Sequence, residues 1–252
     1  MTDLVSLAAA GEVGGDFFKE RSSDTLPCQA NPNEVFCFDW ARENIDRYGT
    51  PTVQHLELVA ISVLIGFAIA FALALLAHRV GWLRAPLLAV TGILYTIPSL
   101  AFFFLLLPVS GIGRDTAIIA LAVYTLQIIY RNTMLGLNNV PSAVKEAARG
   151  MGYTDRQILW RIELPLASRS IVAGAKTSAV IAVGTATIAA FIGAGGYGER
   201  IVAGLAVNDS RMLLAGALPA AALALAVQWV FDASERWVVP AGLRLSTDRA
   251  GV

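Results

Sequence analysis

Long apolar stretches, separated by short polar segments, run through most of the chain. Residues 58–77 carry no charged side chain, and a helix needs about 20 mostly apolar residues to cross the hydrocarbon core of a bilayer. Four later stretches have similar length and composition. The pattern therefore predicts an all-α integral membrane protein with five transmembrane helices, at residues 58–77, 87–107, 116–137, 171–193 and 212–231.

The composition supports a membrane protein and excludes two other classes. Hydrophobic residues make up 56% of the 252 residues and charged residues 15%, whereas an average soluble domain carries roughly 25% charge. The 19 basic and 19 acidic side chains cancel, so the chain lacks the basic field that nucleic-acid binding requires. We therefore expect a lipid bilayer around the chain, no nucleic-acid partner, and no single soluble enzyme domain.

The chain divides into three parts around these spans. Residues 1–55 form a polar, extracytoplasmic N-terminal segment, in which the apolar spacing over 36–48 predicts a short amphipathic helix. Residues 56–235 form the transmembrane domain, and residues 236–252 form a cytoplasmic tail. The first residues lack the basic and long apolar regions of a secretory signal peptide, so none is expected.

The distribution of basic residues predicts the orientation in the membrane. With the N-terminus outside, the inner segments hold eleven Lys and Arg residues and the outer segments seven, four of them in the long N-terminal tail, where the positive-inside rule counts weakly. We therefore expect the N-terminus outside and the C-terminus inside. This orientation puts Cys28 and Cys37 where a disulfide persists, although two unpaired thiols also fit the sequence.

The segment at residues 138–170, between the third and fourth spans, predicts two short helices on the cytoplasmic side. Pro141 suits the start of a helix over 142–149, because the first turn does not need its missing N–H. Gly150 and Gly152 are expected to end that helix, since glycine tolerates the left-handed backbone of a C-cap.

A second helix is predicted to follow within the same segment. Thr154 and Gln157 have the spacing of a capping box, and Pro165 is expected to break the helix before the membrane. A basic, partly apolar helical hairpin of this size either docks on another protein or lies free in solvent.

The same segment resembles the EAA loop of ABC-importer permeases. All elements of that motif are present at full spacing, namely Glu146, Ala147, Ala148, Gly152, Ile162, Leu164 and Pro165. The similarity extends to TIPSL at 96–100, GTATIAAFIGAGG at 184–196 and Asn-Asp at 208–209. Over about residues 52–240 the chain is similar to the osmoprotectant (glycine betaine, choline, carnitine) branch of the methionine-importer-like permease fold.

The resemblance implies a cytoplasmic coupling helix between the third and fourth membrane helices. Glu146 would contact a separate ATPase subunit, Ala147 and Ala148 would allow close packing, and Gly152 would give a sharp turn. It also implies a second permease subunit, identical or homologous, and an external solute-binding protein. No cofactor is expected on this chain, because ATP and Mg²⁺ would bind the ATPase, and the location would be a bacterial cytoplasmic (inner) membrane.

Polar and aromatic side chains inside the spans are candidates for the solute path. A quaternary ammonium is attracted to aromatic faces, and Pro98 and Pro219 free backbone carbonyls of the kind found near transport sites. Ordinary helix packing explains each candidate almost as well. The candidates are Tyr95, Thr96, Ser99, Tyr124, Gln127 and Thr187.

Three further residues with basic side chains lie in or near the spans. Lys176 lies early in the fourth span, where it either reaches the inner interface, alone or paired with a carboxylate such as Glu163, or contacts a gate. His55 and His78 flank the first span and are expected at the membrane interfaces.

Other functions fit less well. The GxGxxG pattern at 193–198 follows a membrane helix and not the strand that a dinucleotide site requires, and no P-loop for ATP is present. Four of the spans lack the acidic carriers of an ion-driven secondary transporter, and none holds the constellation of an intramembrane enzyme. Within the permeases, methionine or a related small amino acid is the alternative substrate.

Overall fold

The computed structural model describes residues 45–238, with side chains as far as residue 235, and every regular element in this range is helical, as predicted. The elements are η2 (Ile45–Tyr48), α3 (Gly49–Arg79), η3 (Gly81–Leu83), α4 (Arg84–Thr96), α5 (Ser99–Ser110), α6 (Arg114–Asn138), α7 (Ser142–Gly150), α8 (Asp155–Ile158), η4 (Leu159–Glu163), α9 (Leu164–Ile188), η5 (Ala189–Ile192), α10 (Gly198–Ala206) and α11 (Ser210–Val238). Cys28, Cys37 and most of the helix predicted at 36–48 lie outside the described residues.

Four helical bodies in the described range are long and apolar enough to cross a membrane. They are Ile45–Arg79, Arg114–Asn138, Asp155–Ile192 and Ser210–Glu235, and they coincide with the first, third, fourth and fifth predicted spans. The first is 35 and the third 38 residues long. At about 1.5 Å per residue, both are longer than the hydrocarbon core of roughly 30 Å, so they extend beyond the apolar stretches seen in the sequence.

The second predicted span is not one helix. α4 ends at Thr96 and α5 begins at Ser99, with a bend of 99° between them, so the prediction of one helix over 87–107 is wrong. Ile97 takes an extended backbone (φ −66°, ψ 128°), because the ring of Pro98 disfavours a helical residue before it. Counted as one bent span, the pair brings the described candidate spans to five.

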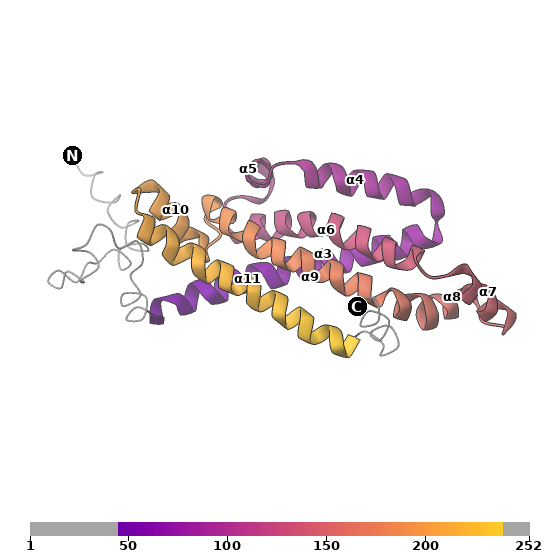
Figure 1. The fold of residues 1–252 in the computed structure, drawn as a ribbon. Coiled ribbons are helices and arrows are strands. Elements are labelled where there is room, and N and C mark those ends of the chain that lie inside the picture. The colour runs from indigo at the N-terminus through magenta and orange to yellow at the C-terminus, as the bar shows by residue number, and fades with distance from the viewer. Residues whose placement is uncertain (1–44, 239–252) are drawn as a thin grey trace, which may run out of the picture. The chain divides into compact units, whose positions relative to one another are not determined.

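Helix α6 lies at the centre of the bundle, with α3, α4, α5 and α9 packed on it (Figure 1). Glycines allow the closest approaches between these helices. A Cβ on Gly66 of α3 would lie 1.7 Å from Oγ1 of Thr125 on α6, and a Cβ on Gly136 of α6 would lie 3.0 Å from the carbonyl of Ala167 on α9. Small residues at helix contacts are typical of membrane bundles.

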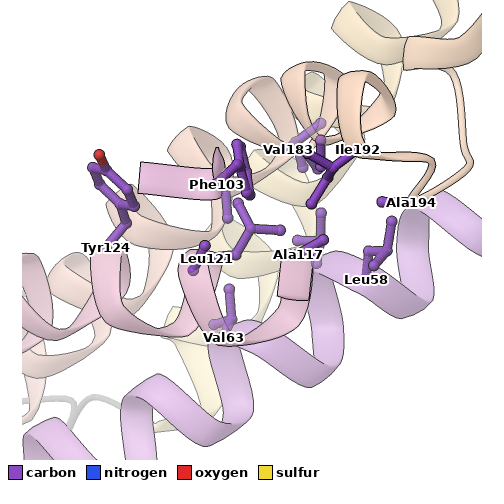
Figure 2. Close-up of a cluster of buried hydrophobic side chains, with 14 of the residues drawn as sticks. Leu58, Val63, Phe103, Ala117, Leu121, Tyr124, Val183, Ile192 and Ala194 are labelled. Atoms are coloured by element: carbon purple, nitrogen blue, oxygen red, sulfur yellow. The ribbon is translucent and has the colours of Figure 1, made fainter. Parts of the chain in front are cut away.

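The largest apolar cluster anchors the short helix α5. Phe103 of α5 is fully buried, and Figure 2 shows it among Ala117 and Leu121 of α6, Val183 of α9 and Ile192 of η5. α5 is therefore held in the bundle although it is bent sharply away from α4.

The two ends of the bundle carry different connections. The 138–170 segment, with α7 and α8, lies at one end, and α10 lies at the other (Figure 1). α10 packs on α11, which continues through Pro219 without a break.

Candidate functional site

The C-terminal end of α7 is fixed by a paired hydrogen-bond motif. The N–H of Gly152 donates to the carbonyl of Arg149 (2.9 Å), and the N–H of Tyr153 donates to the carbonyl of Ala148 (3.1 Å). This is a Schellman motif, which places one residue in the left-handed region, and Gly152 has φ +84°. Gly150 is instead the last helical residue of α7, so Gly152 alone provides the turn.

One face of α7 packs on the protein and the other is open. Ala148 is 1% exposed, whereas Glu146 and Ala147 are exposed. Val144 and Met151 are 40% and 70% exposed, and together with Ala147 they follow helical spacing along one face. α7 therefore presents an apolar strip to which Ala147 contributes and Ala148 does not, and an exposed carboxylate, Glu146, elsewhere on its open surface.

The second helix of the segment begins as predicted but ends differently. The capping box is formed, with the N–H of Thr154 donating to Oε1 of Gln157 at 2.8 Å. α8 then continues through one π-helical turn, η4, into α9, so the predicted break at Pro165 is wrong. The N–H of Leu164 already bonds five residues back, to the carbonyl of Leu159, so the hydrogen-bond ladder has shifted where proline lacks its donor.

The remaining EAA-motif residues join this second helix to the membrane helices. Ile162, Leu164 and Pro165 are half-buried. Leu164 packs against a buried cluster that includes Leu137 of α6 and Leu159 of η4. Apolar packing therefore fixes the start of α9 on the end of α6.

Charged side chains at this end of the bundle pair between elements. Glu163 of η4 is 5% exposed. Its Oε1 lies 3.1 Å from Nζ of Lys145 on α7, and its Oε2 lies 3.0 Å from Nε2 of His78 at the end of α3. Lys176 instead binds Asp232 of α11 at 2.7 Å, so its suggested pairing with Glu163 is wrong. Asp232 directly follows the predicted fifth span, and only the packing of α11 on α9 makes it available.

Three aromatic rings meet where α4 and α5 join. The ring centroid of Tyr124 lies 5.7 Å from that of Tyr95 and 5.7 Å from that of Phe102, in both cases edge to face. The hydroxyl of Tyr124 donates to the carbonyl of Ile97, at the break itself. Tyr95 is 37% exposed, so the group offers one accessible ring backed by two buried ones.

The other four predicted path residues lie apart from the aromatic group and make different contacts. Gln127 of α6 accepts a hydrogen bond from the hydroxyl of Thr91 on α4, which extends the polar contact between these helices. Thr96 and Thr187 donate to carbonyls of their own helices, and Ser99 is half-buried in the first turn of α5.

A small pocket between α6 and α9 adds polar residues to the six named path candidates. Tyr124 and Thr125 line one side of it, and Ser178 and Thr185 line the other. Ser178 and Thr185 are two helical turns apart, so they lie on one face of α9. This spacing is the signal in the sequence that would have singled them out. Phe102 lies one helical turn after Pro98, and its N–H donates to the Pro98 carbonyl, so its place after that proline is the corresponding signal.

At the opposite end of the bundle, α3 holds the glycine-rich turn that follows η5. His55 is fully buried, and its Nε2 lies 3.0 Å from the carbonyl of Val183, so His55 is a packed residue that joins α3 to α9. Gln54 accepts a hydrogen bond from the N–H of Gly196 at 3.2 Å. The turn explains the glycine pattern without a nucleotide, because three of its glycines have positive φ, namely Gly193, Gly195 and Gly196.

Arg200 of α10 is also held at this end, and it is 4% exposed. Its guanidinium lies 4.0 Å from the ring centroid of Tyr48 and donates to the carbonyl of Arg47 at 2.8 Å. Burial lowers the pKa of Arg200, and the neighbouring Tyr48 only partly offsets this effect. The guanidinium nevertheless stays protonated, as it does in proteins generally. Arg200 therefore ties α10 to the start of the first long helix.

A family profile matches residues 62–241, which is most of the chain. The family is described as "Binding-protein-dependent transport system inner membrane component". The match includes the 138–170 segment and all the helices from α4 to α11.

Several curated proteins are similar over most of their length. The osmoprotectant import permease protein OsmW of Salmonella typhimurium is 38% identical over 207 residues, which are 80% of this chain and 96% of the relative. The choline transport system permease protein OpuBB of Bacillus subtilis is 34% identical over 193 residues, 77% of this chain and 89% of the relative. The carnitine transport permease protein OpuCB of Listeria monocytogenes is 36% identical over 203 residues, 81% and 93% of the two chains.

Solved structures of transporters share the fold. A chain of the MetNI methionine ABC transporter in an inward-facing conformation superposes with a TM-score of 0.69 at 23% identity, covering 77% of this chain and 96% of that one. A chain of an amino acid ABC transporter solved with histidines gives a TM-score of 0.67 at 17% identity, covering 80% and 98%. At these identities the likeness shows the fold alone.

The comparisons confirm the resemblance read from the EAA motif and the prediction that this chain is not an enzyme. The family and the relatives are permease subunits of ABC transporters, in which a separate subunit hydrolyses ATP. The chain belongs to the family of inner-membrane components of binding-protein-dependent transport systems, as a multi-pass permease subunit of an ABC importer.

Proposed function

We propose that this permease carries a quaternary-ammonium osmoprotectant of the glycine betaine, choline or carnitine class. The relatives reported above are named for osmoprotectant, choline and carnitine transport, and this chain matches at least 89% of the length of each. A quaternary ammonium has no N–H to donate, so aromatic faces are its natural contacts. The observation on this chain that supports the substrate class is the group of rings formed by Tyr95, Tyr124 and Phe102.

The proposed solute path follows α6, with α4 and α5 on one side of it and α9 on the other. Tyr95 makes the first contact because it is the exposed ring of the group. Gln127 and the pocket residue Thr185 supply polar contacts farther along the path. The full proposed lining is Tyr95, Thr96, Ser99, Tyr124, Gln127 and Thr187, with Phe102, Ser178 and Thr185 added.

The proposed topology has five spans, with α4 and α5 together as the bent second span. The N-terminus lies outside and the C-terminus inside, since the basic residues concentrate in the inner segments on that orientation. Residues 1–55 are then extracytoplasmic, 56–235 form the permeation domain, and 236–252 form a cytoplasmic tail. Cys28 and Cys37 would lie on the outer side, where a disulfide between them persists.

In this topology α7 is the coupling helix that docks on the ATPase. Glu146, Ala147 and the apolar strip of α7 meet the partner, because these side chains are exposed. Ala148 allows α7 to lie close to its own bundle, Gly152 gives the turn, and Ile162, Leu164 and Pro165 hold the start of α9. ATP and Mg²⁺ bind the partner subunit, and this chain contributes only the contact.

The working importer contains two ATPase subunits, a second permease subunit and an external solute-binding protein. The passage forms between the two permeases, identical or homologous. Closure of the ATPases on ATP draws the coupling helices together, and the spans change between outward-open and inward-open states. The energy enters because nucleotide binds the two conformations with different affinity.

An uptake experiment tests the substrate class. The permease is reconstituted in proteoliposomes with its ATPase and binding protein, and uptake of labelled glycine betaine, choline, carnitine and methionine is measured with and without ATP. We expect ATP-dependent uptake of at least one quaternary ammonium, reduced in Tyr95→Leu and retained in Tyr95→Phe, which keeps the ring. Uptake of methionine alone would favour the alternative substrate, and uptake driven by an ion gradient without ATP would contradict the proposal.

A cross-linking experiment tests the docking of α7. In a chain with both native cysteines replaced by serine, Ala147→Cys should cross-link to the ATPase, and Ala148→Cys should not, since Ala148 is buried. Ala147→Cys should also react with a membrane-impermeant maleimide only from the cytoplasmic side. Labelling from the outside would overturn the orientation and the docking together.

A further inference from the structure

A buried carboxylate joins three helices at the end of the bundle that carries α7. Glu163 lies in η4, directly before α9, and both of its oxygens are occupied: Lys145 of α7 lies 3.1 Å from Oε1 and His78 of α3 lies 3.0 Å from Oε2. The side chains of Glu163, His78 and Lys145 are 7%, 14% and 24% exposed. A carboxylate that is buried to this degree is held in one place by its partners.

The other charged contact of α7 has a different character. Arg149 lies 3.2 Å from Asp155 of α8, and the two side chains are 63% and 86% exposed. Exposed ion pairs of this kind contribute little, because water screens them and ordering the side chains costs entropy. Among the described residues, the Lys145–Glu163 pair is therefore the buried one of two ion pairs between α7 and the helical body Asp155–Ile192.

The backbone around Glu163 connects it rigidly to the membrane. Asp155–Ile192 forms one continuous helical body, and Glu163 is the last residue of the π-helical turn inside it. π-helical turns inside α-helices occur often at functional sites. A displacement of Lys145 therefore acts on α9 through the helix itself and on α3 through His78.

We propose that Glu163 is a positioning residue that transmits the movement of α7 to α3 and α9 during transport. The inference rests on the proposed docking of α7 on the ATPase. Glu163 acts through Lys145, with no contact of its own to the ATPase or the solute, and the two spanning helices then move as one unit with α7. Without the charge on Glu163, α7 still docks and ATP is still hydrolysed, but the spans no longer follow.

The test separates ATP hydrolysis from transport in the reconstituted complex. The variants are Glu163→Gln, which keeps the shape and loses the charge, and Lys145→Met, which removes the partner from a helix outside the spans. We expect both to assemble with the ATPase and to hydrolyse ATP within about twofold of wild type, while solute transported per ATP falls at least about fivefold. The double variant Lys145→Met/Glu163→Gln should be no worse than either single variant, and Lys145→Arg should restore most of the coupling.

Two matched controls identify a general effect of lost charge. Asp155→Asn breaks the exposed pair in the same segment, and Glu57→Gln breaks the exposed Arg114–Glu57 pair between α3 and α6. Both should transport within about twofold of wild type, since exposed ion pairs contribute little.

Three outcomes would overturn the proposal. Normal transport per ATP in Lys145→Met would show that the pair is not needed. Loss of ATPase assembly in Lys145→Met would make Lys145 a docking residue, and an equal loss in Asp155→Asn would make the effect general. The result for Glu163→Gln is interpreted only if that variant accumulates in the membrane. If it does not accumulate, the result for Lys145→Met alone tests the proposal. Failure of the wild-type complex to assemble or to transport on ATP would contradict the proposed function and not this inference alone.

Discussion

Two glycines at the end of α7, only two residues apart, should respond in opposite ways to substitution by alanine. Gly152 has φ +84° and Gly150 lies in the helix. A Cβ built on either meets no atom within 4 Å, so neither substitution to alanine creates a clash. The effect of each substitution therefore comes from the backbone alone, which makes the pair a clean comparison.

The magnitudes follow from that backbone difference. An L-residue in the left-handed region costs roughly 1–2 kcal/mol, so Gly152→Ala should destabilise the cap by about that amount. Gly150→Ala should instead stabilise the helix by about 0.5–1 kcal/mol, because alanine loses less entropy than glycine in a helix. Gly152→Asn should cost less than Gly152→Ala, since asparagine tolerates this conformation, and Gly152→Val should cost more.

Amide hydrogen exchange in nanodiscs measures this directly. The protected amides are those that close the cap, at Met151, Gly152 and Tyr153. A loss of 1–2 kcal/mol lowers their protection about 5- to 30-fold in Gly152→Ala, and Gly150→Ala should raise it about two- to fivefold. Changes of the same sign in the two variants, or equal protection in Gly152→Ala and Gly152→Asn, would refute the reasoning. In the transporting complex, Gly152→Val should also lower the solute carried per ATP while the protein still inserts in the membrane.

Five further substitutions test contacts between helices. Gly66→Leu should prevent accumulation of folded protein, because even a Cβ there would overlap a hydroxyl at 1.7 Å, whereas Gly184→Ala, with no atom within 4 Å, should accumulate normally as judged by size-exclusion chromatography. Tyr124→Phe should lower the melting temperature of the purified protein, by the equivalent of about 1 kcal/mol, because the carbonyl at the break loses its donor; an unchanged melting temperature would contradict that contact. Lys176→Met and Asp232→Asn should each destabilise by at most about 1 kcal/mol, because the pair is partly exposed, and the double variant should be no less stable than either.

Three prolines show how far the sequence can predict a membrane helix. Pro98 was expected inside a span and breaks it, Pro165 was expected to break a helix and does not, and Pro219 lies within a continuous helix. The local chemistry of the residue is the same at each position. The outcome depends on the surroundings: Tyr124, far along the chain, satisfies a carbonyl at the first break, and a π-helical turn absorbs the missing donor of Pro165. Neither is visible in a window of sequence.

Local signals, by contrast, predicted local structure well. The capping box at Thr154 and Gln157 and the turn at Gly152 depend on residues at most five apart, and both are observed. The apolar stretches located the long helices, because burial in lipid needs only length and composition. The aromatic group was found in part: Tyr95 and Tyr124 were predicted separately, and only the bend after α4 brings Phe102 to them.

The partners of charged residues were the least predictable feature, and they carry the most mechanical information. Apolar packing has no direction, whereas an ion pair joins two particular points. In the described residues, Arg169 and Lys176 of α9 pair with α11, and Glu163, in the same helical body, pairs with α3 and α7. The body Asp155–Ile192 thus has ion pairs to α7 and α11 and a hydrogen bond to α3. Since α7 has its buried ion pair with this body and not with α3 or α11 directly, a movement that begins at α7 reaches α3 and α11 through it. This is why the charge on Glu163 should matter more for coupling than for assembly.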